Sequence, residues 1–326
     1  MSVTKVTVPA VGPDELVARG KSGSPRYKTR SRSPAWRRRD RRAGYFYLLP
    51  AVALLGAFIL YPLARVIQYS FQSWDGVGPA TYVGFSNYEQ LGQPPQSSAL
   101  GHIGVLFIFF AIIPTALGLM VASLIGRVRM RGMSIFRVIF FLPQVIITVV
   151  IAIVWTWLLA PSGAGSINGI LHALGLGPAV GPAYLGDFNT ALLSLGLIAL
   201  WVNFGLCFLL FLSGVQKISP ELYDSARVDG AGLVREFVHI TVPLLRREMG
   251  AVLIITTVIA LQNFALVYVA TNGGPGTSTI VPGILIYRDA FQLGEVGTAA
   301  ALAVVLAALV AGVTLGIRAL LERRAV

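Results

Sequence analysis

The sequence is poor in cysteine, histidine and charge. Of its 326 residues, one is cysteine, three are histidine and 12% are charged, whereas an ordinary soluble domain is roughly 25% charged. The single cysteine, Cys207, excludes a disulfide within the chain and offers no thiolate cluster to a metal. His102, His172 and His239 are scattered, and no serine, histidine and aspartate share a face. We therefore expect no catalytic constellation, no metal site and no cofactor.

Apolar residues are abundant instead. They make up 55% of the chain, and the mean hydropathy is +0.73. Crossing the hydrocarbon core takes about 20 apolar residues in a helix. Six runs come near that length, at 45–68, 102–125, 137–160, 190–215, 250–270 and 299–320. The sequence therefore predicts an all-α integral membrane protein with six transmembrane helices.

The net charge of +12 would suggest a nucleic-acid partner in a soluble chain, so its location decides its meaning. Twelve of the 26 lysines and arginines lie in residues 1–42. With that segment inside, 24 fall on the inner side and only Arg65 and Arg288 on the other. Basic residues accumulate on the cytoplasmic side of membrane proteins. This bias predicts that both termini are cytoplasmic and that no nucleic acid is bound.

Residues 1–42 are rich in serine, proline, glycine and arginine and lack apolar periodicity. They predict a disordered basic cytoplasmic tail, followed by a membrane domain at 43–326. The letters GKS at 20–22 mimic the end of a phosphate loop, but Glu15 stands where the first glycine belongs. The arginine run could bind RNA, yet a basic cluster before a membrane helix more often fixes orientation or contacts anionic lipid.

The loop at 216–248 is the one long charged passage between two of the most apolar runs. Ser219 followed by Pro220 is typical of a helix start, because serine can cap free N–H groups and proline loses nothing at the first helical position. Asp224 can reach the arginine three residues later. Gly230 then breaks this helix, and a second apolar face follows. The pattern predicts two short helices whose apolar face needs a partner.

The spacing in this loop resembles a known motif. DSA at 224–226, G at 230 and ITVP at 240–243 are similar to E-A-A-x3-G-x9-I-x-L-P, the EAA loop of bacterial ABC importer permeases. Aspartate for glutamate, serine for alanine and valine for leucine are the departures. In that family the loop is a cytoplasmic coupling helix that docks on an ATPase. The resemblance implies an ATPase-coupling role for Tyr223, Asp224, Ser225, Ala226, Asp229, Gly230, Ala231 and Pro243. The alternative is an ordinary amphipathic loop between membrane helices.

Two external segments extend the resemblance. FQSWD at 71–75 with YVGFSNY at 82–88, and the passage from Asn263 to Phe291 containing GGPG at 273–276, are similar to the first permease subunit of maltose and glycerol-phosphate importers. This implies an importer of a sugar or related polyol in the bacterial cell membrane. The implied partners are a second homologous permease subunit, a cytoplasmic ATPase dimer that binds the ATP, and an extracytoplasmic solute-binding protein.

Polar side chains at membrane depth are costly and usually face the interior of the bundle. A sugar offers many hydroxyls and one apolar ring face, so amides beside aromatic rings suit it. On this basis we predict a substrate pathway that is lined by Asn203, Phe204, Thr256, Gln262 and Asn263. The alternative is that these groups only bond across helices.

Two other classes of function compete with an importer subunit. A self-contained channel or ion-coupled secondary transporter would predict carboxylates inside the membrane or inverted repeats, and neither is evident. A membrane enzyme would need a polar catalytic cluster at an interface, and none is found. The chain is therefore predicted to be a transport subunit and not an enzyme.

Overall fold

The computed structural model describes residues 47–126, 132–161, 166–175 and 184–322. The predicted basic tail at 1–42 lies outside the described residues, as do the loop arginines 127, 129 and 131. By its contacts the chain divides into two units, 1–59 and 60–326. Each unit is described by itself.

In the first unit the described residues, 47–59, are all helical. The helix runs on through a π-helical segment, η2 (Gly56–Leu60), into α2 (Tyr61–Tyr69). Tyr47–Tyr69 thus forms 23 residues of apolar helix, which matches the first predicted span. Pro62 lies at the junction of η2 and α2 inside this continuous helix, where its missing N–H removes one helical hydrogen bond.

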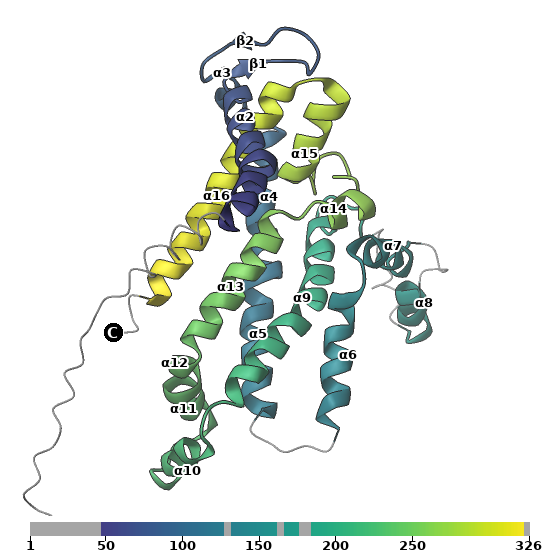
Figure 1. The fold of residues 1–326 in the computed structure, drawn as a ribbon. Helices are drawn as coiled ribbons and strands as arrows, with labels where there is room; N and C mark the ends of the chain where they lie inside the picture. Colours follow the sequence, from purple (N-terminus) through teal and green to yellow (C-terminus); the bar gives the residue numbers. More distant parts are fainter. Residues whose placement is uncertain (1–46, 127–131, 162–165, 176–183, 323–326) are drawn as a thin grey trace, which may run out of the picture. The chain divides into compact units, whose positions relative to one another are not determined.

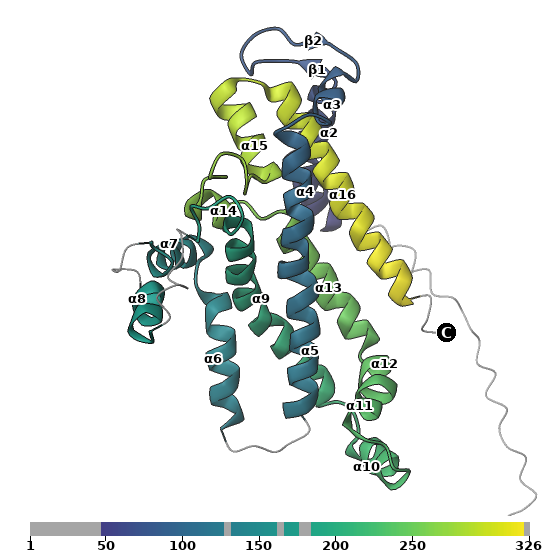
Figure 2. The same ribbon diagram turned by 180° about the vertical axis from the view of Figure 1, so that it is seen from behind.

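The second unit is almost entirely helical (Figures 1 and 2). After α2 its helices are α3 (Ser86–Gln90), α4 (Gln96–Phe107), η3 (Ile108–Ile112), α5 (Ile113–Ile125), α6 (Met133–Val145), α7 (Thr148–Leu158), α8 (Ser166–Ala173), α9 (Ala191–Val215), α10 (Pro220–Val228), α11 (Leu233–Glu236), η5 (Phe237–Thr241), α12 (Val242–Leu244), α13 (Arg246–Leu261), α14 (Ala265–Ala270), α15 (Pro282–Arg288), η6 (Asp289–Leu293) and α16 (Val296–Glu322).

A small hairpin is the exception to the all-α prediction. Strands β1 (Gln72–Ser73) and β2 (Thr81–Tyr82) pair antiparallel. The carboxylate of Asp75 accepts hydrogen bonds from two backbone N–H groups of the turn, at Val77 and Gly78. Such a local side-chain bond favours a turn over a helix, so the hairpin follows from the aspartate and the glycines beside it.

Among the described residues, four helices are long and apolar enough to cross a membrane, and a fifth span exists if a bent pair counts as one. They are Tyr47–Tyr69, Gln96–Ile125, Ala191–Val215 and Val296–Leu321, with α6 and α7 as the bent pair. A multi-helix membrane protein is therefore confirmed. The count of six continuous helices is not reproduced, because the third and fifth predicted runs are broken.

The third run, 137–160, is predicted to be one helix, but α6 and α7 meet at an angle of 96°. Ile146 and Ile147 adopt extended backbone, with ψ of 136° and 131°. Only these two residues leave the helical region, since Val145 and Thr148 on either side lie within α6 and α7. Pro143, inside the last turn of α6, also removes one helical N–H. Hydropathy registers none of this, so the run looks continuous in the sequence.

The fifth run, 250–270, is divided between α13 and the short α14. The helix ends at Leu261, and Gln262, Asn263 and Phe264 form the break. The break coincides with two adjacent amide side chains, and the Asn263 Nδ2 atom is buried there without a partner among the described residues. The break places polar groups inside an otherwise apolar segment.

Helix α9 is the centre of the second unit, and α5 and α6 pack along it. Glycine permits both approaches. A Cβ atom added at Gly205 would lie 1.8 Å from the carbonyl oxygen of Phe140 in α6, and one at Gly118 of α5 would lie 2.8 Å from Cys207 Cβ. Small residues let membrane helices come this close. The buried rings of Phe208 and Phe211 fill the space around the contact.

Candidate functional site

The helix pair α10 and α11 lies at one end of the α9 and α13 helices, and the hairpin and α15 lie at the other end in both views (Figures 1 and 2). Helix α10 begins at Pro220, as the sequence predicts, although the Ser219 hydroxyl makes no capping bond. Gly230 has φ of +79°, a left-handed conformation that other residues resist. Because of this turn, α11 doubles back beside α10.

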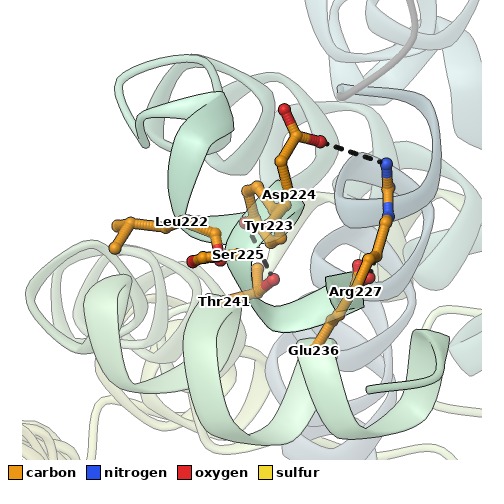
Figure 3. A network of polar contacts seen from close by, with 7 residues as sticks. All are labelled: Leu222, Tyr223, Asp224, Ser225, Arg227, Glu236 and Thr241. Carbon is orange, nitrogen blue, oxygen red and sulfur yellow. Dashed lines mark hydrogen bonds and ion pairs between the residues drawn. The ribbon is translucent and has the colours of Figure 1, made fainter. Parts of the chain in front are cut away.

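Two side-chain links hold α10 against the segment that follows it (Figure 3). The hydroxyls of Tyr223 and Thr241 lie 3.0 Å apart and share a buried hydrogen bond. Arg227 donates through Nε to the Glu236 carboxylate at 3.0 Å, and its Nη1 lies 3.5 Å from Asp224 Oδ1. The Glu236 side chain is 1% exposed. A buried carboxylate needs such a partner, so the link fixes the angle between the two helices.

The other face of α10 and α11 is open. The side chain of Asp224 is 71% exposed, and Ser225, Asp229 and Gly230 are exposed beside it. Val228 and Val234 are 88% and 77% exposed. A surface depression of about 630 Å³ is lined by Gly230, Gly232, Leu233, Val234, Arg235, Val238 and His239.

The eight residues predicted for coupling divide by position. Those on the open face are Asp224, Ser225, Asp229 and Gly230, whereas Tyr223 is buried and Ala226, Ala231 and Pro243 are half-buried. The structure thus assigns Tyr223 to the internal link. The sequence analysis did not predict the ion pair between Arg227 and Glu236 that forms the second link. Two opposite charges nine residues apart, on either side of a glycine turn, are a signal that could have predicted it.

The predicted pathway residues lie on α9, on α13 and at the break after α13. Asn203 is 2% exposed, and its Nδ2 donates to the Ala199 carbonyl at 2.8 Å, which leaves its buried Oδ1 without a partner. Asn263 Nδ2 is likewise buried without a partner. Gln262 is exposed. Phe204 stacks on Phe208, with ring centroids 6.1 Å apart.

Adjacent threonines on α13 differ in their bonding. The Thr256 hydroxyl donates to the Val252 carbonyl of its own helix at 2.9 Å. The Thr257 hydroxyl is buried and has no hydrogen-bond partner among the described residues. Thr257 is therefore the better candidate to meet a ligand. The sequence points to Thr256 because two neighbouring threonines cannot be told apart without the hydrogen bonds.

Chemically, these groups can accept and donate hydrogen bonds without carrying charge. Asn203 offers an acceptor, Asn263 a donor, and Thr257 either. Within the described residues, no group of three or more histidines, cysteines, aspartates or glutamates could hold a metal ion.

Comparison with known proteins identifies the family. Residues 81–326 match the model of the binding-protein-dependent transport system inner membrane component. The chain belongs to this family. The transport subunit and the multi-pass membrane location predicted from the sequence are thereby confirmed.

Relatives of this permease extend over most of its length. A probable ABC transporter permease protein of Bacillus subtilis is 33% identical over 264 residues, which cover 80% of this chain and 89% of that protein. A diacetylchitobiose uptake system permease protein of Streptomyces coelicolor is 32% identical over 268 residues, covering 79% and 76%. A sulfoquinovosyl glycerol transport system permease protein of Agrobacterium fabrum is 33% identical over 284 residues, covering 85% and 90%.

A solved structure shares the fold of the permease. It is a bacterial ABC transporter involved in the import of the acidic polysaccharide alginate, with a TM-score of 0.75 and 23% identity, covering 89% of this chain and 98% of that chain. A second structure of an alginate transporter, with a TM-score of 0.74, holds a periplasmic protein with bound alginate pentasaccharide.

Proposed function

We propose that this permease translocates a neutral sugar or related polyol past Asn203, Thr257 and Asn263. The main support is that each of these three residues has a buried polar atom without a hydrogen-bond partner among the described residues. The three residues lie on α9, on α13 and at the break after α13. An unsatisfied buried polar group costs about 1–3 kcal/mol, so it persists where something else satisfies it. Sugar hydroxyls can do so, because each one both donates and accepts.

The names of the relatives support the substrate class. They include an uptake system for diacetylchitobiose and a trehalose/maltose transport system of Thermococcus litoralis, and both names denote neutral sugars. The family match gives no support to a self-contained channel or secondary transporter. We assign Phe204 the role of an apolar wall beside Asn203, and we retain Thr256 and Gln262 only as neighbours of the pathway.

The partners follow from the open face of α10 and α11. We propose that a cytoplasmic ATPase dimer docks there, where exposed apolar side chains surround the depression beside Gly230. A second, homologous permease subunit completes the pathway, and an extracytoplasmic binding protein delivers the sugar. Six membrane crossings with both termini in the cytoplasm, predicted from the distribution of basic residues, are part of this proposal.

A matched pair of threonine variants tests the pathway. Thr257→Val keeps the shape of the side chain and removes the unpartnered hydroxyl, whereas Thr256→Val removes a hydroxyl that is bonded within its own helix. We expect Thr257→Val, like Asn203→Ala, to weaken sugar uptake about two- to tenfold, because one hydrogen bond is worth about 0.5–1.5 kcal/mol. Basal ATP hydrolysis and assembly should persist.

The measurement is uptake of maltose, trehalose and diacetylchitobiose by the transporter assembled with its native partner subunits. Thr256→Val should transport at nearly the wild-type rate. Equal rates for Thr257→Val, Asn203→Ala and wild type would assign these groups to helix packing alone and refute the pathway.

A further inference from the structure

Four aromatic rings form a continuous run that neither the coupling face nor the buried polar groups account for. Phe264 stacks on Tyr268 with ring centroids 4.9 Å apart, and both rings contact Tyr287, at 5.9 and 5.6 Å. Tyr287 in turn contacts Phe291 at 5.6 Å. We call these four residues the aromatic ladder. It joins the break after α13 to α14, α15 and η6.

One end of the ladder adjoins the proposed pathway and the other reaches the surface. Phe264 directly follows Asn263, whose Nδ2 is buried without a partner. Exposure then rises along the ladder to 36% at Tyr287 and 79% at Phe291. Both views show α15 next to α14, at the end of the second unit away from α10 (Figures 1 and 2). The ladder therefore leads from that end toward the amides.

The chemistry of the ladder favours one kind of occupant. Its rings offer apolar faces, and the Tyr268 and Tyr287 hydroxyls make no hydrogen bond with any described residue, so they remain able to donate and accept. Arg288, the residue after Tyr287, donates through Nη2 to the Asn272 carbonyl at 2.7 Å. The ladder thus pairs apolar faces with neutral polar tips, as a sugar ring does.

A membrane-interface belt or a contact between subunits would arrange the rings differently. A belt places aromatic rings around the protein at one depth, whereas this run crosses from a helix break to the surface. A contact with a second permease subunit would engage the exposed Phe291 and would not need rings that continue inward to Asn263. Continuity with the unpartnered amide distinguishes a path for ligand from both.

We propose that the aromatic ladder is a low-affinity binding surface for a neutral sugar ring, which it guides from the external face to Asn263. The inference rests on the proposed function and adds a subsite to it. Phe291 and Tyr287 contribute the exposed faces, whereas Phe264 and Tyr268 pack partly against the core at the inner end, so no single ring binds tightly. A sugar that is released at this face is thereby kept on the path while the transporter closes.

The test compares a substitution that removes the aromatic ring at Phe291, the exposed end of the ladder, with one that keeps an aromatic ring there. Phe291→Leu removes the aromatic face but keeps an apolar side chain, and Phe291→Trp keeps a face. Tyr82→Leu is the control, since Tyr82 is 77% exposed on β2 and lies outside the ladder. The transporter is assembled in proteoliposomes with its native partners, and the probes are maltose, trehalose and diacetylchitobiose.

The measured quantity is sugar carried per ATP hydrolysed, which a packing role would not change. Phe291→Leu should lower this ratio about two- to tenfold, the range expected for one aromatic contact. Phe291→Trp and Tyr82→Leu should keep the wild-type ratio. An unchanged ratio in Phe291→Leu, or a loss explained by failure of the second permease subunit to co-purify, overturns the ladder. Absence of uptake of all three sugars by the wild-type protein overturns the proposed function as well.

Discussion

At the residue scale, Asp289 is the buried charge with the clearest effect on stability. Its side chain is 3% exposed in η6. Burial, with a smaller contribution from the neighbouring Glu295 carboxylate, raises the pKa of Asp289 to about 6, although Arg288 opposes the shift. The folded state therefore holds a proton on Asp289 at pH values where the unfolded chain has lost it. Between about pH 4 and pH 6, this group makes the folded state less stable as pH rises.

Replacing Asp289 with asparagine should remove that dependence. Asp289→Asn keeps the shape and cannot ionise, so we expect it to stabilise the protein at pH 7.5 by about 1–3 kcal/mol and to flatten the change between pH 4 and 6. Thermal unfolding of the detergent-purified protein across this range measures both effects. Glu89→Gln, at an exposed carboxylate in α3, is the control. A lower melting temperature for Asp289→Asn at pH 7.5 would contradict the assignment.

Sequence and structure agree best at the residue scale where a side chain has one plausible environment. Asn203 is predicted to be buried and polar from its position in an apolar run, and it is 2% exposed. The same reasoning cannot distinguish Thr256 from Thr257, because both are 0% exposed and only their hydrogen bonds differ. Partner choice depends on backbone geometry that residue type does not encode.

At the scale of elements, α10 depends on its neighbours. A nine-residue helix is unstable by itself in water. The Tyr223–Thr241 and Arg227–Glu236 links supply the missing stabilisation, and they require the chain to reverse between α10 and α11. The reversal depends on the positive φ at Gly230. A substitution that strains the backbone at Gly230 should therefore change the orientation of the whole proposed docking face.

Gly230→Val should leave the protein in the membrane and lower both ATPase co-purification and transport, because a left-handed backbone costs a residue with a Cβ about 1–2 kcal/mol. Gly230→Asn should be milder, since asparagine tolerates this conformation. Gly101→Ala in α4 is the control, because Gly101 has no positive φ, lies outside the docking face and has open space around its Cα. Co-purification of the ATPase at wild-type yield with Gly230→Val, together with normal transport, would contradict the role of the turn.

The elements themselves are only partly predictable. Hydropathy locates every apolar run, but it cannot foresee the bend between α6 and α7 or the break at Gln262. Both interruptions consist of a few residues whose backbone leaves the helical region, and a window average hides them. The Gly230 turn is predictable, because glycine after a charged helix has a specific local meaning.

At the scale of the whole molecule, the motif spacing at 224–243 predicts the family, and the comparison with known proteins confirms it. In our proposal the spacing is this specific because it marks the surface on which the ATPase docks. The proposed orientation in the membrane rests on a different signal, because it would put 24 basic residues on the inner side and two on the outer side. Moving so much charge to the outer side would oppose the rule that governs insertion.

Cysteine labelling tests that orientation directly. Cys207 is the single cysteine of the chain, so Cys207→Ala gives a background without a thiol. Gln93 and Gly232 are both exposed, near the hairpin and near α11 respectively. A cysteine introduced at Gln93 should react with a membrane-impermeant maleimide in intact cells, whereas one at Gly232 should react only after permeabilisation. Because the sites lie at opposite ends of the second unit (Figures 1 and 2), the reverse pattern would invert the whole topology and place the proposed docking face outside, where no ATPase could reach it.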